Sequence, residues 1–331
     1  MLVGHNGTRS DLRAEHITAL KVFDSGMAGN DQVVWAITSF YNPVRYKRRL
    51  SNYHFFRTNL CVPLVTVELS FDGNFELNKS DADTLIQISG GAVLWQKERL
   101  LNLALRAVPQ AVDRVAWIDC DLILRRPDWV EEAKRQLDNF SVVQLFSDAI
   151  HLKSEDISSS EPGKHDSVPG IVGLSDARQV ILLKSNLNYY QSGFAWAARR
   201  ELLEQHSFYD AAIVGGGDCM MLGAAYGRYD GIAERFLLNK IRRRHYFDWA
   251  IPFHKSVGER IGHIAGTLYH LAHGELRNRR YGDRHAMLAG FDFDPDVDLR
   301  VGPHGAWEWA RPRPDLESFL KNYFVARAED A

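Results

Sequence analysis

The residues best suited to chemistry are two aspartates that follow an apolar run. The segment reads Trp117-Ile118-Asp119-Cys120-Asp121, and a second apolar run comes directly after it. Alternate side chains of an extended chain share a face, so Asp119 and Asp121 could offer oxygen ligands to one hard cation. Mg²⁺ and Mn²⁺ prefer such ligands and also bind phosphate groups. The pattern predicts a divalent metal site, and two solvated acids in a turn are the alternative.

Two histidines three residues apart, His270 and His273, form a second candidate. Such a pair can approach one metal, although helical zinc sites prefer a spacing of four with an adjacent glutamate. A third ligand at suitable spacing is missing, which disfavours a hydrolytic zinc site. Four arginines follow and could neutralise donor phosphates or an anionic acceptor, or could form a solvated basic face: Arg277, Arg279, Arg280 and Arg284.

A third candidate is Asp218, which follows three consecutive glycines. The residues from 218 to 226 predict a helix with Asp218 as its N-cap. A helix N-terminus favours an ionised carboxylate, so Asp218 could accept a proton from a reacting hydroxyl. A plain capping role is the alternative.

These residues must be positioned by the elements around them. Apolar runs predict strands at 33–39, 64–69, 84–89 and 114–118, with helices at 43–57 and 95–108 between them. Strands separated by helices predict an α/β fold with an open, mostly parallel sheet. Ligands of such sheets bind beyond the carboxyl ends of the strands, so we expect residues 39–42, 68–72 and 119–121 to meet in one crevice.

Composition agrees with a folded, water-soluble chain. Of the 331 residues, 45% are hydrophobic and 25% are charged, and the formal charge of −2 gives no support for a nucleic-acid partner. The three cysteines lack a C-x-x-C pair, which excludes a disulfide framework as the basis of the fold. No apolar run approaches the ~18 residues of a membrane span. We expect a cytoplasmic protein that could lie peripherally against a membrane.

Three segments resemble the nucleotide-sugar half of GT-A-fold glycosyltransferases: residues 36–43, 95–102 and 117–121. The resemblance covers about residues 32–285 and implies a Rossmann-like GT-A fold with helices on both faces. It also implies a hexosyltransferase that uses Mn²⁺ or Mg²⁺ and a nucleotide-sugar donor, with a UDP-sugar favoured. The residues that this resemblance assigns to the donor are Thr38, Ser39, Tyr41, Asn42, Glu68, Arg99, Asn102 and Asp119. By their charge, Arg279 and Arg284 are further candidates for its phosphates.

The second half is similar to the acceptor segment of β-galactosyltransferase-like and polypeptide N-acetylgalactosaminyltransferase-like enzymes, through residues 191–200 and 215–218. This similarity implies acceptor contacts at Trp196, Gly216 and Gly217 and a metal held by Asp119, Asp121 and His273, with His270 in reserve. The family motif is usually Gly-Gly-Glu-Asp, and its second acid is the base of inverting transfer. Here Asp218 matches the first acid and Cys219 the second. Asp218 is therefore the candidate base on chemical grounds, with inverting transfer slightly preferred.

The chain divides into a lead-in at 1–30, a GT-A domain at 31–285 and a C-terminal extension at 286–331. The domain splits after residue 125 into a nucleotide-sugar half and an acceptor half, and residues 151–173 predict a flap that closes over the donor. Three alternatives remain: retaining transfer on the same fold, a nucleotidyltransferase, and a non-catalytic sugar-binding module. Residues 39–43 lack the glycines of a phosphate loop, which disfavours the second, whereas Cys219 favours the third. The acceptor could be a glycan, a small molecule, a protein or a modified nucleic acid, and the oligomeric state is open.

Overall fold

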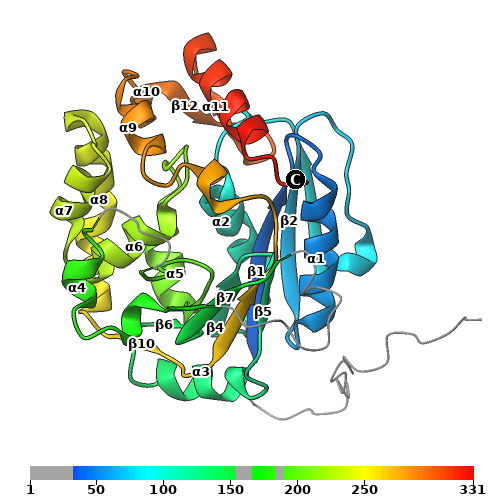
Figure 1. Cartoon of the computed structure of the whole chain (residues 1–331), viewed down its shortest axis with the longest axis vertical. Coiled ribbons are helices and arrows are strands. Elements are labelled where there is room, and N and C mark those ends of the chain that lie inside the picture. Colours follow the sequence, from blue (N-terminus) through cyan, green and yellow to red (C-terminus); the bar gives the residue numbers. More distant parts are fainter. Residues whose placement is uncertain (1–32, 154–165, 184–188) are drawn as a thin grey trace, which may run out of the picture.

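The computed structural model describes residues 33–153, 166–183 and 189–331 (Figure 1). The expected lead-in at 1–30 and the middle of the expected flap lie outside the described residues. The two described ends of the flap belong to paired strands, β7 (Asp148–His151) and β8 (Ser167–Pro169).

A seven-stranded sheet forms the centre of the described chain. Its order is β10-β6-β9-β4-β1-β2-β3, and only β9 runs antiparallel to its neighbours. The strands are β1 (Val34–Tyr41), β2 (Leu64–Ser70), β3 (Thr84–Ser89), β4 (Arg114–Ile118), β6 (Val142–Gln144), β9 (Ala195–Arg199) and β10 (Ile261–His263). The predicted α/β class with a mostly parallel sheet is confirmed.

Both faces of the centre of this sheet are covered, which explains why β1, β2 and β4 are mostly apolar and buried along nearly their whole length. Alternate residues of β1 enter two separate apolar clusters: Ile37 joins one cluster, and Val34 and Ala36 join the other. The first cluster includes residues of the helices at 97–107, 200–206, 217–225 and 240–257, and the second includes residues of the helices at 47–59 and 129–137. Figure 1 shows α1 (Lys47–Asn59) beside β2, with α6 (Gly217–Ala225), α7 (Tyr229–Arg235) and α8 (Lys240–Val257) gathered away from it.

The longer helices are α1 (Lys47–Asn59), α2 (Lys97–Ala107), α3 (Trp129–Leu137), α5 (Arg200–His206), α6 (Gly217–Ala225), α7 (Tyr229–Arg235), α8 (Lys240–Val257) and α11 (Pro314–Ala326). The shorter ones are α4 (Ala177–Val180), α9 (Arg284–Ala289) and α10 (Pro295–Asp298), with 3₁₀ turns at η1 (Lys79–Asp81), η3 (Ile171–Gly173) and η4 (Leu276–Arg279).

Two expected helix starts are wrong. The helix expected from Pro43 begins at Lys47, because Asn42 uses its side chain to close a turn with Tyr46, with 2.9 Å from Asn42 Oδ1 to Tyr46 N. Asp218 is not an N-cap: the capping position of α6 is Gly216, whose φ of 96° favours glycine, and Asp218 lies in the first turn.

A second sheet lies against the carboxyl end of β4, with the order β5-β11-β7-β8. Its remaining strands are β5 (Leu122–Leu124) and β11 (Thr267–His270), which pair antiparallel so that His270 stands opposite Leu122. This pairing brings the histidine segment to the aspartate segment, although about 150 residues separate them along the chain. A two-stranded sheet of β12 (Leu299–Val301) and β13 (Trp307–Trp309) completes the strands.

The last residues of the chain return to the centre of the molecule. The side chains of Leu316, Leu320 and Phe324 on α11 belong to the same apolar cluster as α2 and the sheet. Asp330 accepts hydrogen bonds from the backbone N–H of Lys47 and Arg48, at 3.0 and 2.8 Å, and so caps α1. The proposed boundary after residue 285 stays a prediction.

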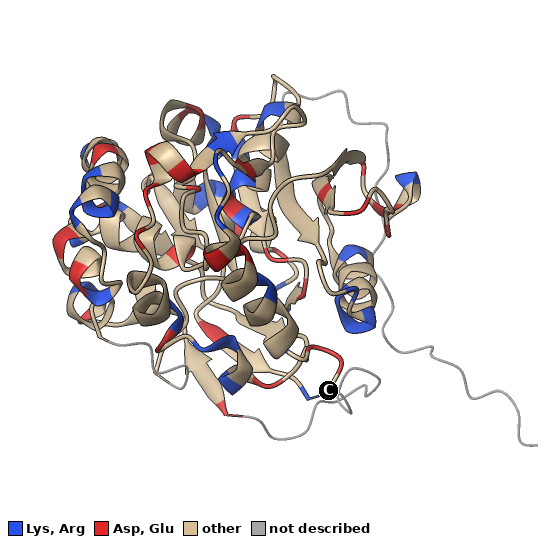
Figure 2. Cartoon of the chain, turned by 90° about the horizontal axis from the view of Figure 1, so that it is seen from above, with Lys and Arg blue, Asp and Glu red and all other residues tan. Residues whose placement is uncertain are grey.

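Charged residues of both signs are interspersed along the ribbon, as Figure 2 shows, in keeping with the formal charge of −2. Within the described ranges, no helix combines the length and the apolar character needed to cross a bilayer.

Candidate active site

One cleft collects most of the candidate residues at the carboxyl ends of β1 and β4. It holds about 1130 Å³ of space, including its open mouth. Ten residues singled out in the sequence line it: Ser39, Tyr41, Asp119, Asp121, Gly216, Asp218, His270, His273, Arg279 and Arg284. The expected crevice therefore exists for β1 and β4, whereas residues 68–72 lie elsewhere.

Three of these side chains converge as a group that could hold a metal: Asp121, His270 and His273, whose ligand atoms lie within 4.8 Å of one another. Nε2 of His273 is 2.8 Å from Oδ2 of Asp121 and 3.0 Å from Nε2 of His270. Asp119 is outside this group. The chain turns after β4 ends at Ile118 instead of continuing extended, so the two aspartates are not aimed at one point.

The chemistry of this group fits a divalent cation. Oδ1 of Asp121 is buried without a hydrogen-bond partner, which is costly unless a ligand satisfies it. Burial lowers the pKa of His270 well below its usual value, so its imidazole is neutral and can coordinate. One carboxylate and two imidazoles suit Mn²⁺ and other first-row cations better than they suit Ca²⁺.

A second layer of charged groups surrounds His273. Nη2 of Arg279 contacts both ring nitrogens of His273 and lies 2.5 Å from Nδ1. Oε2 of Glu329 lies 3.6 Å from the same Nδ1. Glu329 is 1% exposed and also pairs with Arg49 at 3.1 Å and Arg327 at 2.5 Å. The C-terminal residues thus form part of the wall behind the histidine.

Lys97 connects the two remaining carboxylates of the cleft. Its Nζ lies 2.6 Å from Oδ1 of Asp119 and 2.8 Å from Oδ2 of Asp218. Burial alone would lower the pKa of Lys97, but Asp119 and Asp218 overcome this and raise it well above its usual value. Lys97 is therefore a fixed cation that ties the end of β4 to the first turn of α6.

The backbone around Asp218 is packed too closely for side chains larger than hydrogen. A Cβ on Gly217 would lie 2.2 Å from Oε1 of Glu98, and one on Gly193 would lie 2.9 Å from Oδ2 of Asp218. The glycines preceding Asp218 thus allow α6 to start directly over α2. This contact is the physical reason for the glycine run that the sequence displays.

Glu98 is a buried acid next to this contact. It is 5% exposed, and its Oε1 has no hydrogen-bond partner. Burial raises the pKa of Glu98 to about 8, although neighbouring Lys97 acts in the opposite direction. Glu98 is a neutral acid below that pH.

Asn42 and Glu68 line a second, smaller cavity beside the first. Adjacent residues Tyr41 and Asn42 face different cavities, so both cavities open at the carboxyl end of β1. Glu68 is 2% exposed and accepts hydrogen bonds from Glu76 N at 2.5 Å and Gln87 Nε2 at 2.8 Å. Its carboxylate thereby holds the loop that forms the cavity wall.

Five other candidates do not line the main cleft: Thr38, Arg99, Asn102, Trp196 and Gly217. Thr38 donates to the carbonyl of Ile118 at 2.6 Å. Arg99 and Asn102 both bond to Asp210, at 3.3 and 3.1 Å. Trp196 is fully buried and stacks on Trp117 with ring centroids 6.3 Å apart. The contacts of these four side chains hold the scaffold together.

Sequence reasoning missed several charged residues of the cleft, including Lys97, Arg49, Arg235, Arg327 and His285. Lys97 could have been recognised from the sequence, because it shares the apolar helix stripe of Leu100, Leu101 and Ala104, where a charged residue needs a buried partner.

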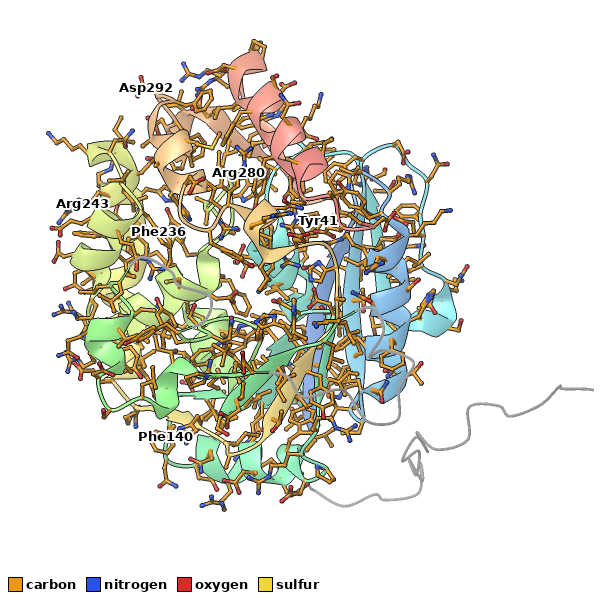
Figure 3. All side chains as sticks on the ribbon, in the orientation of Figure 1. Tyr41, Phe140, Phe236, Arg243, Arg280 and Asp292 are labelled. Atoms are coloured by element: carbon orange, nitrogen blue, oxygen red, sulfur yellow. The ribbon has the colours of Figure 1, made fainter. Side chains whose placement is uncertain are left out.

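Figure 3 labels Tyr41 and Phe236 on either side of the segment that carries Arg280, and the cleft lies between these elements.

No protein-family model matches the sequence, and no curated protein matches it. Solved structures with distant likeness include glucosyl-3-phosphoglycerate synthase from Mycobacterium tuberculosis, in complex with Mn²⁺, UDP and phosphoglyceric acid, at 14% identity over 85% of this chain and 88% of that one, with a TM-score of 0.37. The catalytic domain of Drosophila β1,4-galactosyltransferase 7 aligns at 10% identity over 87% and 98%, with a TM-score of 0.40. A 4-diphosphocytidyl-2C-methyl-D-erythritol synthase from Anaerococcus prevotii aligns at 10% over 71% and 87%, with a TM-score of 0.33. Likeness at this level does not establish a family.

Proposed function

We propose that the chain is a divalent-metal-dependent glycosyltransferase that moves a sugar from a nucleotide-diphosphate donor, with a UDP-sugar favoured, to an acceptor hydroxyl. The observation that carries this proposal is that one cleft holds both a metal-binding group and a carboxylate in the first turn of α6. Asp121, His270 and His273 supply the first part, and Asp218 supplies the second. Guanidinium groups that line the same cleft, including that of Arg279, suit a diphosphate.

The metal would offset the negative charge that develops on the departing diphosphate. Asp121, His270 and His273 would hold it, while Asp119 stays paired with Lys97. Arg279, beside His273, can bind a phosphate group. In this assignment His270 is a metal ligand, whereas Asp119 is not a ligand and contributes only through its contact with Lys97.

Asp218 takes the role of the base in this proposal. Lys97 fixes its Oδ2, and the packing of Gly217 on Glu98 fixes the backbone that carries it. A carboxylate held in this way can accept the proton of an acceptor hydroxyl that attacks the sugar, which leads to inverted stereochemistry. If transfer proceeds with retention, Asp218 orients the acceptor instead.

The second cavity is proposed to receive the nucleoside. It opens at the same strand end as the main cleft, and Asn42, Ser70 and Glu76 bring amide, hydroxyl and carboxylate groups to it. These groups suit hydrogen bonds to a ribose and a base edge. Ser39 and Tyr41 would then lie between the nucleoside and the diphosphate.

The metal-binding group of Asp121, His270 and His273, taken alone, also fits a non-haem Fe(II) oxygenase, because such enzymes bind iron with two histidines and one carboxylate. The observation that favours the transferase is the pairing of this group with cationic side chains on one wall and a polar cavity at the end of β1. Oxygen consumption that depends on Fe(II), without nucleotide binding, would support the oxygenase instead.

Hydrolysis of the donor by the purified chain tests the proposal, because transferases of nucleotide sugars pass the sugar slowly to water when no acceptor is present. A panel of UDP- and GDP-sugars with Mn²⁺ should give nucleotide release for at least one donor, and Asp121→Ala should abolish it. Asp128→Ala is the matched control, since Asp128 is an exposed acid that pairs with Arg126 outside the cleft. Release that continues unchanged in Asp121→Ala would contradict the proposal.

A further inference from the structure

A cluster of basic side chains near the start of α6 lacks any acidic partner among the described residues. Its members are Arg235, Arg242, Arg284 and His285, and none of them forms a salt bridge with a described carboxylate. Three other cations of the cleft do have acidic partners: Lys97 pairs with Asp119 and Asp218, and Arg49 and Arg327 pair with Glu329. The cluster differs from these three, whereas Arg279, which contacts His273, likewise forms no salt bridge with a described carboxylate.

Within this cluster, the guanidinium groups of Arg235 and Arg284 line the cleft and bond only to neutral partners. Nη1 of Arg235 donates to the hydroxyl of Tyr190 at 3.0 Å and lies 3.1 Å from Sγ of Cys219. Nη1 of Arg284 donates to the hydroxyl of Tyr323 at 3.1 Å, while its Nε is buried without a partner. Arg284 is 5% exposed, so its charge is screened little by water.

His285 completes the cluster and has unused hydrogen-bonding capacity. It is 6% exposed, both of its ring nitrogens lack partners, and its ring stacks on Phe236 at 3.9 Å. Its Nε2 would lie 3.0 Å from a Cβ on Gly216, so the ring stands against the residue that caps α6. Burial and the charges of Arg284, Arg242 and Arg235 lower the pKa of His285 well below its usual value, which leaves a neutral ring with one N–H to donate.

Buried positive charge without a partner is destabilising, and proteins retain it where a ligand supplies the opposite charge. The start of α6 adds backbone N–H groups and the positive end of a helix dipole to the same place. The neighbouring Cys219 fits this reading. Burial raises the pKa of its thiol, which therefore stays neutral and leaves the charge of Arg235 free.

We propose that Arg235, Arg284 and His285 bind a phosphate group carried by the acceptor, next to Asp218. That this phosphate belongs to an acceptor rests on the proposed function, whereas the anion site itself does not. Two guanidinium groups, one imidazole N–H and a helix start suit the three oxygens and the double charge of a phosphate monoester better than they suit a carboxylate. The acceptor is then a small phosphorylated molecule whose hydroxyl reaches Asp218 when its phosphate lies on Arg235.

Calorimetric titration of the full chain with inorganic phosphate tests this site. The titration is run in EDTA, so that no metal draws phosphate to the histidine group. Arg235→Gln should weaken binding at least about tenfold, and Cys219→Asp should do the same by placing a carboxylate against Arg235. Arg235→Lys, which keeps the charge, should retain part of the affinity. Thermal unfolding of each variant shows that the fold is intact.

Arg243→Gln is the matched control, because the Arg243 side chain on α8 is 38% exposed and pairs with Asp230 away from the cleft. Its phosphate affinity should equal that of the unaltered chain. Equal affinity in Arg235→Gln, no phosphate binding at all, or binding of acetate in place of phosphate would each overturn the proposal.

A second titration, with a saturating nucleotide and Mg²⁺, separates this site from the donor site. Phosphate should still bind; displacement by the nucleotide would place the anion in the donor site and overturn the proposal. Phosphate binding that depends on Arg235 in a chain that binds no nucleotide would support the anion site and remove only the glycosyltransferase assignment. Nucleotide binding without phosphate binding would support the glycosyltransferase assignment and overturn the anion site.

Discussion

Nζ of Lys97 lies 2.8 Å from Oδ2 of Asp218, and this contact ties the start of α2 to the start of α6. The same ammonium reaches Asp119 at the end of β4. Three elements that are distant in sequence are thus held by one buried cation. The geometry of the proposed base therefore depends on a residue that neither gives nor takes a proton in the proposed reaction.

Replacement of Lys97 by methionine should destabilise the fold and reduce donor turnover. The change leaves Asp119 and Asp218 close together without a positive charge, and breaking a buried ion pair in this way costs about 3 kcal/mol. Urea unfolding measures the change in the free energy of unfolding. Lys134→Met, which removes a surface pair with Glu131, should change that free energy by less than ~0.5 kcal/mol. Equal effects of the two changes would contradict the bridging role.

Asp218→Asn should separate binding from chemistry. The amide keeps the shape of the side chain but cannot accept a proton, so sugar transfer should fall by about 10²- to 10⁴-fold. Nucleotide affinity should stay within about twofold of that of the unaltered chain, because the metal group does not include Asp218. Single-turnover rates and calorimetry give the two values. An unreduced rate would exclude Asp218 as the base.

Glu98 predicts a dependence of stability on pH. Its pKa of about 8 in the folded chain lies above the ordinary value of 4.5, so the unfolded carboxyl ionises first as the pH rises. The free energy of unfolding should therefore fall between about pH 4.5 and 8, with a slope of at most ~1.4 kcal/mol per pH unit from this group. Glu98→Gln should remove that contribution and become the more stable form towards pH 8.

Denaturant unfolding from pH 5 to pH 8 checks the Glu98 prediction. Glu131→Gln is the control, since the Glu131 side chain is 72% exposed and should leave the pH profile unchanged. A profile of Glu98→Gln that runs parallel to that of the unaltered chain would refute the assignment of a neutral buried acid.

The centre of the sheet could be predicted from the sequence because β1, β2 and β4 are buried on both faces. The run that forms β4 has no polar residue after Arg114, so the limits of the strand are clear. The observed bounds of β2, β3 and β4 lie within one residue of the expected ones. The start of α1 was harder to predict. Pro43 is a common first residue of a helix, but the side chain of Asn42 closes a turn that competes with it.

The site could be predicted only where chemistry and local sequence coincide. Asp121 and His273 stand out by type and spacing, and β5 and β11 bring them together. The partner of Asp119 could not be read from the D-x-D segment, because Lys97 approaches it from another element. Glu329 could not be found either, since nothing near the end of the chain marks it as a neighbour of His273.

Glu329 should tune metal binding through His273. A carboxylate behind a ligating imidazole fixes the ring and raises its basicity, and its loss typically weakens metal affinity by about 10- to 100-fold. Glu329→Gln should therefore lower the affinity for Mn²⁺ in this range, as measured by the fall of the free-ion signal in electron paramagnetic resonance. The neighbouring change Asp330→Asn, which affects only the cap of α1, should leave that affinity unchanged.

The most direct test of the proposed donor site is calorimetry of UDP and GDP binding, with Mn²⁺, with EDTA, and in Asp121→Ala. One of the two nucleotides should bind in the presence of Mn²⁺, and its binding should disappear in EDTA and in Asp121→Ala. Because Asp121 provides the only carboxylate of the group formed with His270 and His273 in the described chain, its removal should leave too few ligands. Binding of neither nucleotide under any of these conditions, or binding that is indifferent to metal and to Asp121, would contradict the account.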